Sequence, residues 1–301
     1  MSSSGKKVVA VVGLNGELGK PTLSALTSPE FKNYYHFPIR AVTTKNNKFE
    51  EFSDSEVSYH KVDYNDASSL VAAFNGVDVV IDLGSHKNTQ ILLDAAIEAH
   101  VKLFFPSVYS PDYGPEKKDY SGLLAFKDFY HDDRLKCLNL KVGWFADWVI
   151  SKLAVLFLSN EPNKAVRVGD GNTKIPVTFI SDIAKSLASL AHHSPEKLPE
   201  KVCVQSDVYT QNELFKIYEE VKGVKLDIEE RSIDTQLQIA AQADKKQKSD
   251  MFDFLNVITA TMVSPKRMYV DYSKGKDMKL VNPGIFEWKK IIPEAKKAWS
   301  S

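Results

Sequence analysis

Short apolar runs alternate with amphipathic stretches over the first two thirds of the chain, and this alternation predicts the fold. Each run is short, rich in Val, Ile and Phe and bounded by polar residues, as expected of buried strands. Between them lie helical patterns such as residues 88–100, where Ile91, Leu92 and Ala95 are expected on one buried face. Strands in this rhythm predict an α/β fold, a doubly wound parallel sheet with helices on both faces. The predicted strands are KVVAVVG (7–13), FPIRAVTT (37–44), EVSYHKVDY (56–64), VDVVIDLG (77–84), VKLFFPS (101–107) and LKCLNLKVGWF (135–145).

The pattern changes after a further strand near residues 201–206. A helix then runs to a stop at Gly223, and a long polar-rich helical stretch follows, for which Asp234 is a plausible cap. We therefore predict a larger domain and a smaller α/β substrate lobe. The larger domain comprises residues 1–150 and about 177–206, and the smaller lobe about 151–176 and 207–301.

Composition and charge narrow the class of protein. The 301 residues include 39 Lys and Arg against 39 Asp and Glu, a balance that does not favour a nucleic-acid or membrane-surface partner. Apolar stretches such as LAVLFL (153–158) are too short to cross a bilayer, and MSSSGKK leads into a strand without an apolar signal core. Two distant cysteines, Cys137 and Cys203, fit a reducing compartment. We expect a cytoplasmic protein, with the nucleus as an alternative.

Three glycines at a spacing of three follow the first strand and precede a helix. In this context the first allows a tight turn, the second admits a diphosphate, and the third lets the helix pack closely on the strand. The start of the helix adds N–H groups and a positive dipole. A purely structural glycine turn is the alternative, and the strand before and helix after the turn favour the nucleotide interpretation. The predicted dinucleotide turn comprises Gly13, Asn15, Gly16, Glu17, Leu18 and Gly19.

The end of the second strand indicates which dinucleotide is bound. NAD-binding enzymes place a carboxylate at the end of the second strand, about 20 residues beyond the glycines, but here that region reads IRAVTTKNNK and holds no acid before Glu50. Thr43, Thr44 and Lys45 can instead receive a 2′-phosphate, which favours NADP(H). The alternative is that the lysines of this segment are ordinary solvated side chains.

The segments GLNGELGK, VDYNDASSLVAAFNGVDVVI, QILLDAAIEAHVKLFFPSVY, LKVGWFADWV and GDGNTKIPVTFISDIA resemble the NmrA-like and isoflavone-reductase-like branch of the atypical short-chain dehydrogenases, fungal members above all. The resemblance covers roughly residues 7–220 and implies an NADP(H)-binding Rossmann domain. It also implies that Asp63 lies beside the adenine, although Asp63, with Asn65 and Asp66, could merely cap the helix at 68–76. The loop residues that it assigns to the middle and nicotinamide parts of the cofactor are Gly84, Ser85, Pro106, Ser107 and Tyr109, with His86 beside them.

The catalytic proton donor is less clearly marked. The Tyr-x-x-x-Lys pair of ordinary short-chain dehydrogenases is missing from the expected region. The resembled reductases carry a lone helical lysine about 20 residues past a Pro-Ser motif, and Lys127 in LLAFKDF occupies that place, with Tyr109 as a second candidate. A solvated surface lysine is the alternative. The chain reads PSVYS where many of those reductases read PSEFG, which argues against plant-type ether and isoflavonoid substrates.

Two functions remain open from the sequence. The first is an NADPH-dependent reductase that transfers hydride to a small carbonyl, enone or quinone, with Trp144, Phe145 and Trp148 as candidates for the cleft wall. The second is an NADP(H)-sensing regulatory protein of the NmrA type, which acts on a protein partner without turnover. A sugar-nucleotide epimerase is a third, weaker possibility, because this chain has no tyrosine in the place that epimerase chemistry requires. The histidines show no metal-ligand spacing, so no metal site is predicted.

Overall fold

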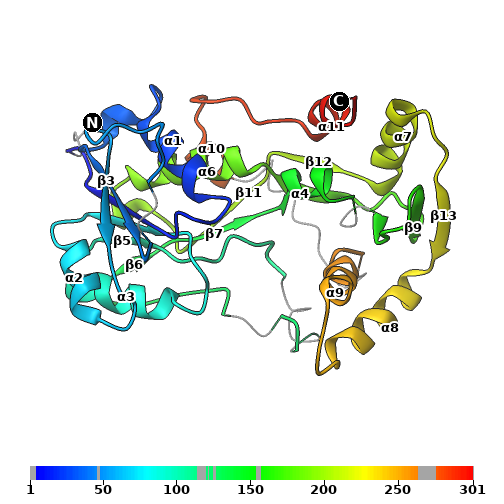
Figure 1. Cartoon of the computed structure of the whole chain (residues 1–301), viewed down its shortest axis with the longest axis horizontal. Helices are drawn as coiled ribbons and strands as arrows, with labels where there is room; N and C mark the ends of the chain where they lie inside the picture. Colours follow the sequence, from blue (N-terminus) through cyan, green and yellow to red (C-terminus); the bar gives the residue numbers. More distant parts are fainter. Residues whose placement is uncertain are drawn as a thin grey trace.

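The computed structural model describes residues 5–45, 48–113, 120, 122–124, 127–153, 157–263 and 276–300. The elements form two halves side by side, and Figure 1 shows the first part of the chain, in blue and cyan, on the left and the later yellow and orange part on the right. Within the described part of the chain, every helix is too short or too polar to cross a membrane.

The first half is built on a six-stranded sheet in the order β3-β2-β1-β4-β5-β6, and all its pairings are parallel. The chain moves outward from β1 to β3 and then returns to place β4 on the other side of β1. Such a reversal opens a crevice at the carboxyl ends of the two central strands. The strands are β1 (Val9–Val12), β2 (Ile39–Thr43), β3 (Val57–Lys61), β4 (Val79–Asp82), β5 (Leu103–Phe105) and β6 (Lys136–Cys137).

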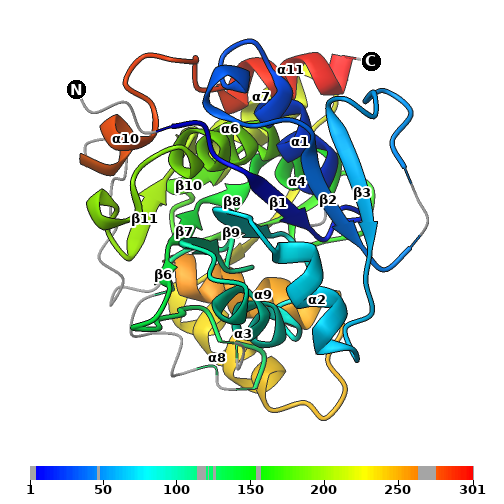
Figure 2. The ribbon, with the colours of Figure 1, turned by 90° about the vertical axis from the view of Figure 1, so that its left-hand side faces the viewer.

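Both faces of this sheet are covered by helices. Val9 and Val11 belong to one core, whereas Ala10 and Val12 belong to the core on the opposite face. Figure 2 shows α1 and α6 on one side of the sheet and α2 and α3 on the other. The predicted α/β doubly wound fold is therefore confirmed. These helices are α1 (Gly19–Thr27), α2 (Ala67–Phe74), α3 (Thr89–Glu98) and α6 (Ile180–Ala191).

The second half has its own core, to which two of three small strand groups contribute; Leu140, Val142, Val202 and Val204 of the remaining group lie in a core of the first half. In one group β10 pairs in parallel with β8 and antiparallel with β12; the parallel pairs β7/β11 and β9/β13 form the other two. The strands are β7 (Asn139–Val142), β8 (Trp144–Phe145), β9 (Lys164–Val168), β10 (Ile175–Thr178), β11 (Lys201–Val204), β12 (Asp207–Tyr209) and β13 (Asp227–Arg231). The remaining helices of the described chain are α4 (Ala146–Ser151), α7 (Gln211–Lys222), α8 (Ile233–Asp244), α9 (Met251–Val263), α10 (Lys276–Val281) and α11 (Ile291–Ser300), and its 3-10 turns are η1 (Lys32–Tyr34) and η3 (Pro195–Lys197).

The last part of the chain does not stay in one half. Helix α10 packs against α6 and β11, and its Val281 is buried in the first core. Phe286 follows it there and meets the ring of Phe31 edge-on, with centroids 6.4 Å apart. Residues 276–288, assigned to the smaller lobe from the sequence, thus pack on the larger one, while α11 returns to the second core through Trp299.

Local details of the helices separate correct from wrong expectations. Gly223 ends α7 with φ +64°, as predicted. Helix α8 is capped by Ser232, which accepts the Thr235 N–H, so the expectation of Asp234 as the cap is wrong. Ile91 is also not buried: it is 41% exposed, because α3 packs on both the sheet and α2 through a face that includes Leu93 instead.

Candidate functional site

The glycine turn has a geometry in which each glycine meets a different requirement. Gly13 has φ +86°, and a Cβ there would overlap the backbone of Gly84; a Cβ on Gly19 would overlap the backbone of Leu14. At Gly16 the nearest atoms to such a Cβ are carbonyl oxygens at 3.6 and 3.7 Å, an ordinary contact distance. The fold itself therefore requires the first and third glycines. The second is exposed and meets only ordinary contacts, which leaves room for a ligand to approach the backbone.

Helix α1 starts directly behind this turn. Its N-cap residue Leu18 makes no side-chain cap bond, and its first turn holds no acidic side chain. An N-terminus of this kind favours an anion. Glu17 lies just before the helix and reaches across to α4, where it accepts a hydrogen bond from Trp148 Nε1 and lies 3.7 Å from Lys152 Nζ. The turn is thereby linked to the second half of the molecule.

The residues predicted to bind the 2′-phosphate lie at the end of β2 and directly after it, and β2 is the strand beside β1. Thr43 is buried, and its Oγ1 accepts the Lys45 N–H at 3.1 Å. Thr44 and Lys45 are exposed, so their side chains are accessible to a ligand. Among the described residues nearby, Glu51 forms an ion pair with Lys20.

Asp63 lies at the carboxyl end of β3 and is exposed. Its Oδ1 accepts bonds from the backbone and side-chain amides of Asn65, at 2.9 and 3.0 Å. The cap of α2 is Asp66, which accepts the Ser68 N–H at 3.0 Å. Of the three residues proposed as a cap, Asp66 is therefore the N-cap, whereas Asp63 bonds Asn65 in the turn before the helix. A place for Asp63 beside the adenine stays a prediction.

The loops after β4 and β5 meet beside the glycine turn. Ser107 Oγ donates to the Gly84 carbonyl at 2.6 Å, and Gly84 lies against Gly13. Ser85 and His86 continue the first loop on the surface, and Pro106 is buried in the second. The fold thus brings together predicted site residues that lie up to 94 positions apart in the sequence, Gly13 and Ser107.

Sequence reasoning missed a buried carboxyl under these loops. Asp82, the last residue of β4, is fully buried. Its Oδ1 accepts the Gly84 N–H at 2.9 Å, its Oδ2 accepts the Thr89 hydroxyl at 2.7 Å, and the Ser107 N–H also donates to it. Burial raises the pKa of Asp82 to about 6, against these stabilising hydrogen bonds. The signal in the sequence was an acid at the end of the apolar run VDVVID.

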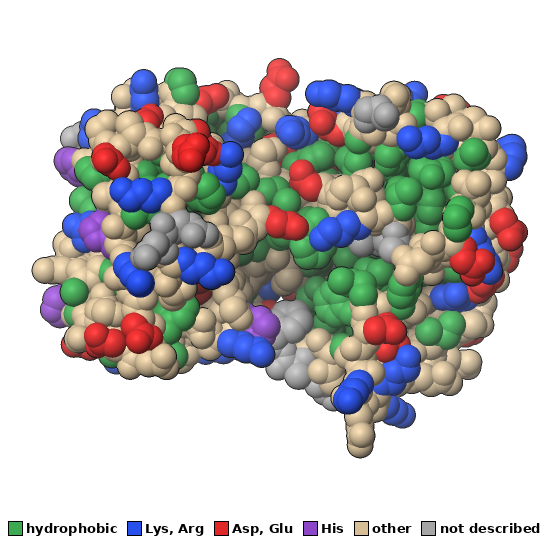
Figure 3. All heavy atoms as spheres, in the orientation of Figure 1, with side chains coloured by type: hydrophobic (Ala, Val, Ile, Leu, Met, Phe, Trp, Pro, Cys, Tyr) green, Lys and Arg blue, Asp and Glu red, His purple; other side chains and the backbone are tan. Residues whose placement is uncertain are grey.

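A cavity of about 520 Å³ opens next to these loops. Among the site residues predicted from sequence it includes Leu18, His86, Ser107 and Tyr109, but neither Pro106 nor Lys127. Its remaining lining is mostly apolar and comes from both halves: Leu83, Val108, Ser110, Pro111, Tyr113, Leu123, Gly143, Trp144, Phe145, Trp148, Phe254 and Ile258. Figure 3 shows the surface hollowed where the two halves meet, with hydrophobic side chains gathered on the right-hand wall. All three aromatic residues proposed for a cleft wall therefore line the cavity.

Two polar atoms in this wall are buried without a hydrogen-bond partner in the described structure: Tyr109 Oη and Trp144 Nε1. Unpaired buried polar atoms are uncommon and often mark a functional position. Burial, with the nearby Asp82 carboxylate, raises the pKa of Tyr109 well above its usual range. At neutral pH the Tyr109 hydroxyl is consequently a hydrogen-bond donor and not a base.

Lys127 lies away from the residues that line the cavity. Residues 127–130 form no helix, so the expectation of a helical lysine is wrong; residues 125 and 126 lie outside the described part. Its Nζ donates to Gln90 Oε1 at 3.2 Å and lies 4.0 Å from the centre of the Tyr130 ring. Tyr130 is hydrogen-bonded to Thr89, which donates to Asp82. Lys127 is therefore connected to Asp82 only indirectly, through Tyr130 and Thr89.

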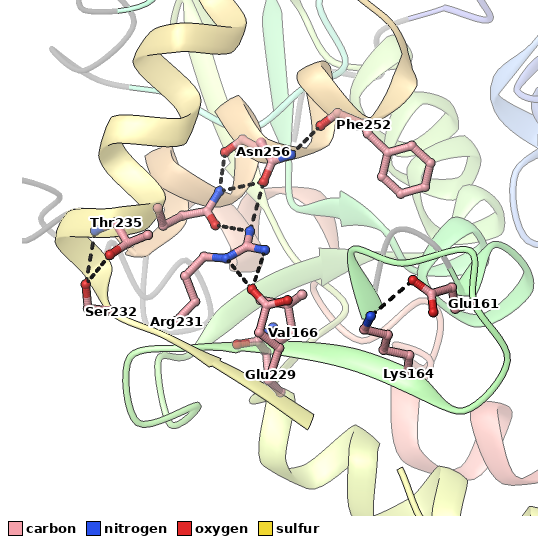
Figure 4. A network of polar contacts seen from close by, with 11 residues as sticks. Glu161, Lys164, Val166, Glu229, Arg231, Ser232, Thr235, Phe252 and Asn256 are labelled. Carbon is pink, nitrogen blue, oxygen red and sulfur yellow. Dashed lines mark hydrogen bonds and ion pairs between the residues drawn. The ribbon is translucent and has the colours of Figure 1, made fainter. Parts of the chain in front are cut away.

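The cavity wall contributed by α9 is held by a polar network (Figure 4). Arg231, at the end of β13, donates to Gln236 Oε1 at 2.9 Å and to Asn256 Oδ1 at 3.2 Å. Gln236 Nε2 donates in turn to the Asn256 carbonyl at 2.9 Å. These bonds tie α8 and α9 to β13. They fix the helix that supplies Phe254 and Ile258 to the cavity.

Comparison of the sequence with known proteins finds similarity to one family. Residues 5–129 match the model of the NmrA-like family. Isoflavone reductase homolog IRL of Zea mays is 29% identical over 228 residues, which cover 71% of this chain and 70% of the relative.

Solved structures share the fold over nearly the whole chain. A structure titled AtPrR2 with NADP+ and (+)pinoresinol superposes with a TM-score of 0.67 at 21% identity, covering 97% of this chain and 99% of the other. An NADPH-dependent quinone oxidoreductase, QOR2 of Escherichia coli complexed with NADPH, superposes with a TM-score of 0.64 at 17% identity, covering 96% and 99%. The N-terminal segment of this chain is thus similar to the NmrA-like family, the longer match is to an isoflavone reductase homolog, and the solved structures share the fold.

Proposed function

We propose that the protein is an NADPH-dependent reductase that transfers hydride to a small, largely apolar carbonyl, enone or quinone. The observation that carries this proposal is the adjacency of two features. A glycine turn that is open at Gly16 lies beside a cavity of about 520 Å³, whose wall combines aromatic side chains with Ser107 and Tyr109. One relative is named an isoflavone reductase homolog and one neighbour an NADPH-dependent quinone oxidoreductase, and two of the solved structures are titled with NADP+ or NADPH.

The residues around the turn fit a phosphorylated dinucleotide. The backbone from Gly13 to Gly19 and the uncapped start of α1 would bind the diphosphate. Thr43, Thr44 and Lys45 would bind the 2′-phosphate, in a segment whose sequence has no acid before Glu50. When bound, NADPH supplies the hydride. The largely apolar cavity wall excludes water from the neighbouring substrate space.

Tyr109 is the better placed of the two proton-donor candidates. Its side chain lines the cavity, and its neutral hydroxyl, buried and unpaired in the described structure, would donate to a substrate oxygen placed against it. Lys127 would act indirectly, through the successive contacts of Tyr130, Thr89 and Asp82, and not by direct contact with the substrate. Tyr109→Phe would therefore remove a direct contact with the substrate, whereas Lys127→Ala would remove only an indirect one.

The test is oxidation of NADPH, followed by absorbance, with a panel of quinones, aldehydes and enones. Turnover on at least one acceptor, lost in Tyr109→Phe while NADPH still binds, supports the reductase. Tight NADPH binding with no turnover across the panel contradicts it.

That second outcome would favour a non-catalytic NADP(H) sensor with a protein partner. One observation supports this alternative: Lys127 is engaged by Gln90 and Tyr130 and lies outside the cavity lining. A sensor would change its affinity for a protein partner between NADP+ and NADPH, which can be measured with the same purified chain.

A further inference from the structure

Among the described residues, Asp82 is the one carboxyl that accepts hydrogen bonds from both cofactor-side loops, and the proposed hydride transfer does not use it directly. It is fully buried at the carboxyl end of β4. A carboxylate at such a position is costly unless its oxygens are hydrogen-bonded. A carboxyl at this position therefore points to a role that an apolar side chain could not fill.

Three donors converge on this side chain. The Gly84 N–H donates to Oδ1 at 2.9 Å, the Thr89 hydroxyl donates to Oδ2 at 2.7 Å, and the Ser107 N–H donates from the loop after β5. The Ser107 hydroxyl closes the arrangement with its 2.6 Å bond to the Gly84 carbonyl. One carboxylate therefore joins the ends of β4 and β5 and the start of α3.

The position of Gly84 makes this arrangement relevant to the cofactor. Gly84 packs against Gly13, the first glycine of the turn, so closely that a side chain at Gly13 has no room. A shift of the Gly84 loop away from Gly13 would consequently disturb the cavity edge at His86 and Ser107. Hydrogen bonds from N–H groups to a charged acceptor are stronger than those to a neutral one.

We propose that Asp82 is a positioning residue that holds residues 84–86 against residues 106–107 beneath the nicotinamide half of the cofactor. This inference rests on the proposed NADPH-dependent function. Asp82 acts through the loop backbones and does not touch substrate. Burial, together with the charge of Asp82, raises the pKa of Tyr64, Tyr109 and Tyr130, so all three remain neutral donors.

The test compares two ligands on two variants by calorimetry. NADPH spans the whole site, whereas 2′,5′-ADP carries no nicotinamide half. Asp82→Asn keeps the shape of the side chain but removes the charge, and it is expected to weaken NADPH binding about tenfold while 2′,5′-ADP binding changes less than about twofold. Asp78→Asn is the matched control, because Asp78 lies at the other end of the same strand and bonds Val8 N and Lys102.

Hydrogen exchange gives a second readout that needs no ligand. In Asp82→Asn the amides of residues 83–88 and 106–110 should exchange faster, with β1 and β2 unchanged. Equal weakening of both ligands, or no weakening of either together with unchanged loop exchange, would overturn the proposal. A wild-type protein that binds neither NADPH nor 2′,5′-ADP would instead refute the proposed function, while the exchange result would still judge the role of Asp82.

A second variant protects the test against misfolding of the first. Thr89→Val removes only the hydroxyl donor to Oδ2 and leaves both loop amides in place. It is expected to weaken NADPH binding in the same direction but less than Asp82→Asn, again without affecting 2′,5′-ADP. If Asp82→Asn does not fold and Thr89→Val leaves NADPH binding unchanged, the proposal is wrong.

Discussion

Replacing Asp82 with asparagine should make the protein more stable above pH 6 while weakening its predicted cofactor site. Folding moves this carboxyl from water into a fully buried position, where its pKa rises from 3.8 to about 6. The folded protein then binds the Asp82 proton more tightly than the unfolded chain does. The contribution of this proton to the free energy of unfolding is fully present below the unfolded pKa of 3.8 and is lost as the pH rises through about 6.

The magnitude follows from that difference in pKa. At about 1.4 kcal/mol per pKa unit, the whole loss amounts to about 3 kcal/mol, and roughly half of it falls between about pH 5 and pH 8. Asparagine has no charge to bury, so its stability lacks this pH dependence. The free energy of unfolding of Asp82→Asn minus that of wild type should accordingly rise by about 1.5 kcal/mol between these two pH values.

Urea unfolding at a series of pH values measures this difference. Every other titrating group is common to both proteins and cancels in the subtraction, provided that the two transitions have equal m-values. A flat difference between pH 5 and 8 would show that Asp82 is not a buried, costly carboxylate. A difference that falls with pH would mean that its hydrogen bonds stabilise the charged form more than burial destabilises it.

Further variants test other parts of the account. Gly13→Ala should lower the free energy of unfolding by about 2–4 kcal/mol in urea titrations, because φ is +86° and the new methyl group overlaps Gly84; normal stability would show that the turn is not as described. Tyr109→Phe should raise stability by about 1 kcal/mol, since it removes a buried unpaired hydroxyl, and should slow NADPH-dependent turnover at least about tenfold; unchanged turnover would exclude Tyr109 as proton donor. Lys45→Ala should weaken NADPH binding about fivefold in calorimetry and leave NADH binding unchanged, and an equal effect on both would remove the 2′-phosphate role.

Sequence reasoning worked best where one residue type is required locally. The fold class follows from alternating strand and helix patterns, and the roles of Gly13 and Gly19 follow from their spacing, because a side chain at either position would meet backbone. Caps were less predictable. Ser232 and Asp234 are both good N-cap residues, and only the path of the chain decides between them.

Features that depend on distant packing were not visible in the sequence. The amphipathic pattern of α9 indicates a buried face, but not that Phe254 and Ile258 lie opposite the β5 loop in one cavity. Asp82 reads as the polar end of a strand until its three donors are seen together. The environment of Lys127 likewise depends on where α3 places Gln90, which spacing within the segment does not reveal.

Calorimetry of wild type and Gly16→Val with NADPH and NADH tests the central claim most directly, because Gly16 is the glycine that the fold itself leaves open. We predict that the wild type binds NADPH more tightly than NADH, and that Gly16→Val unfolds at the same urea concentration as wild type yet loses NADPH binding. No heat with either dinucleotide, a preference for NADH, or full NADPH affinity in Gly16→Val would contradict the account.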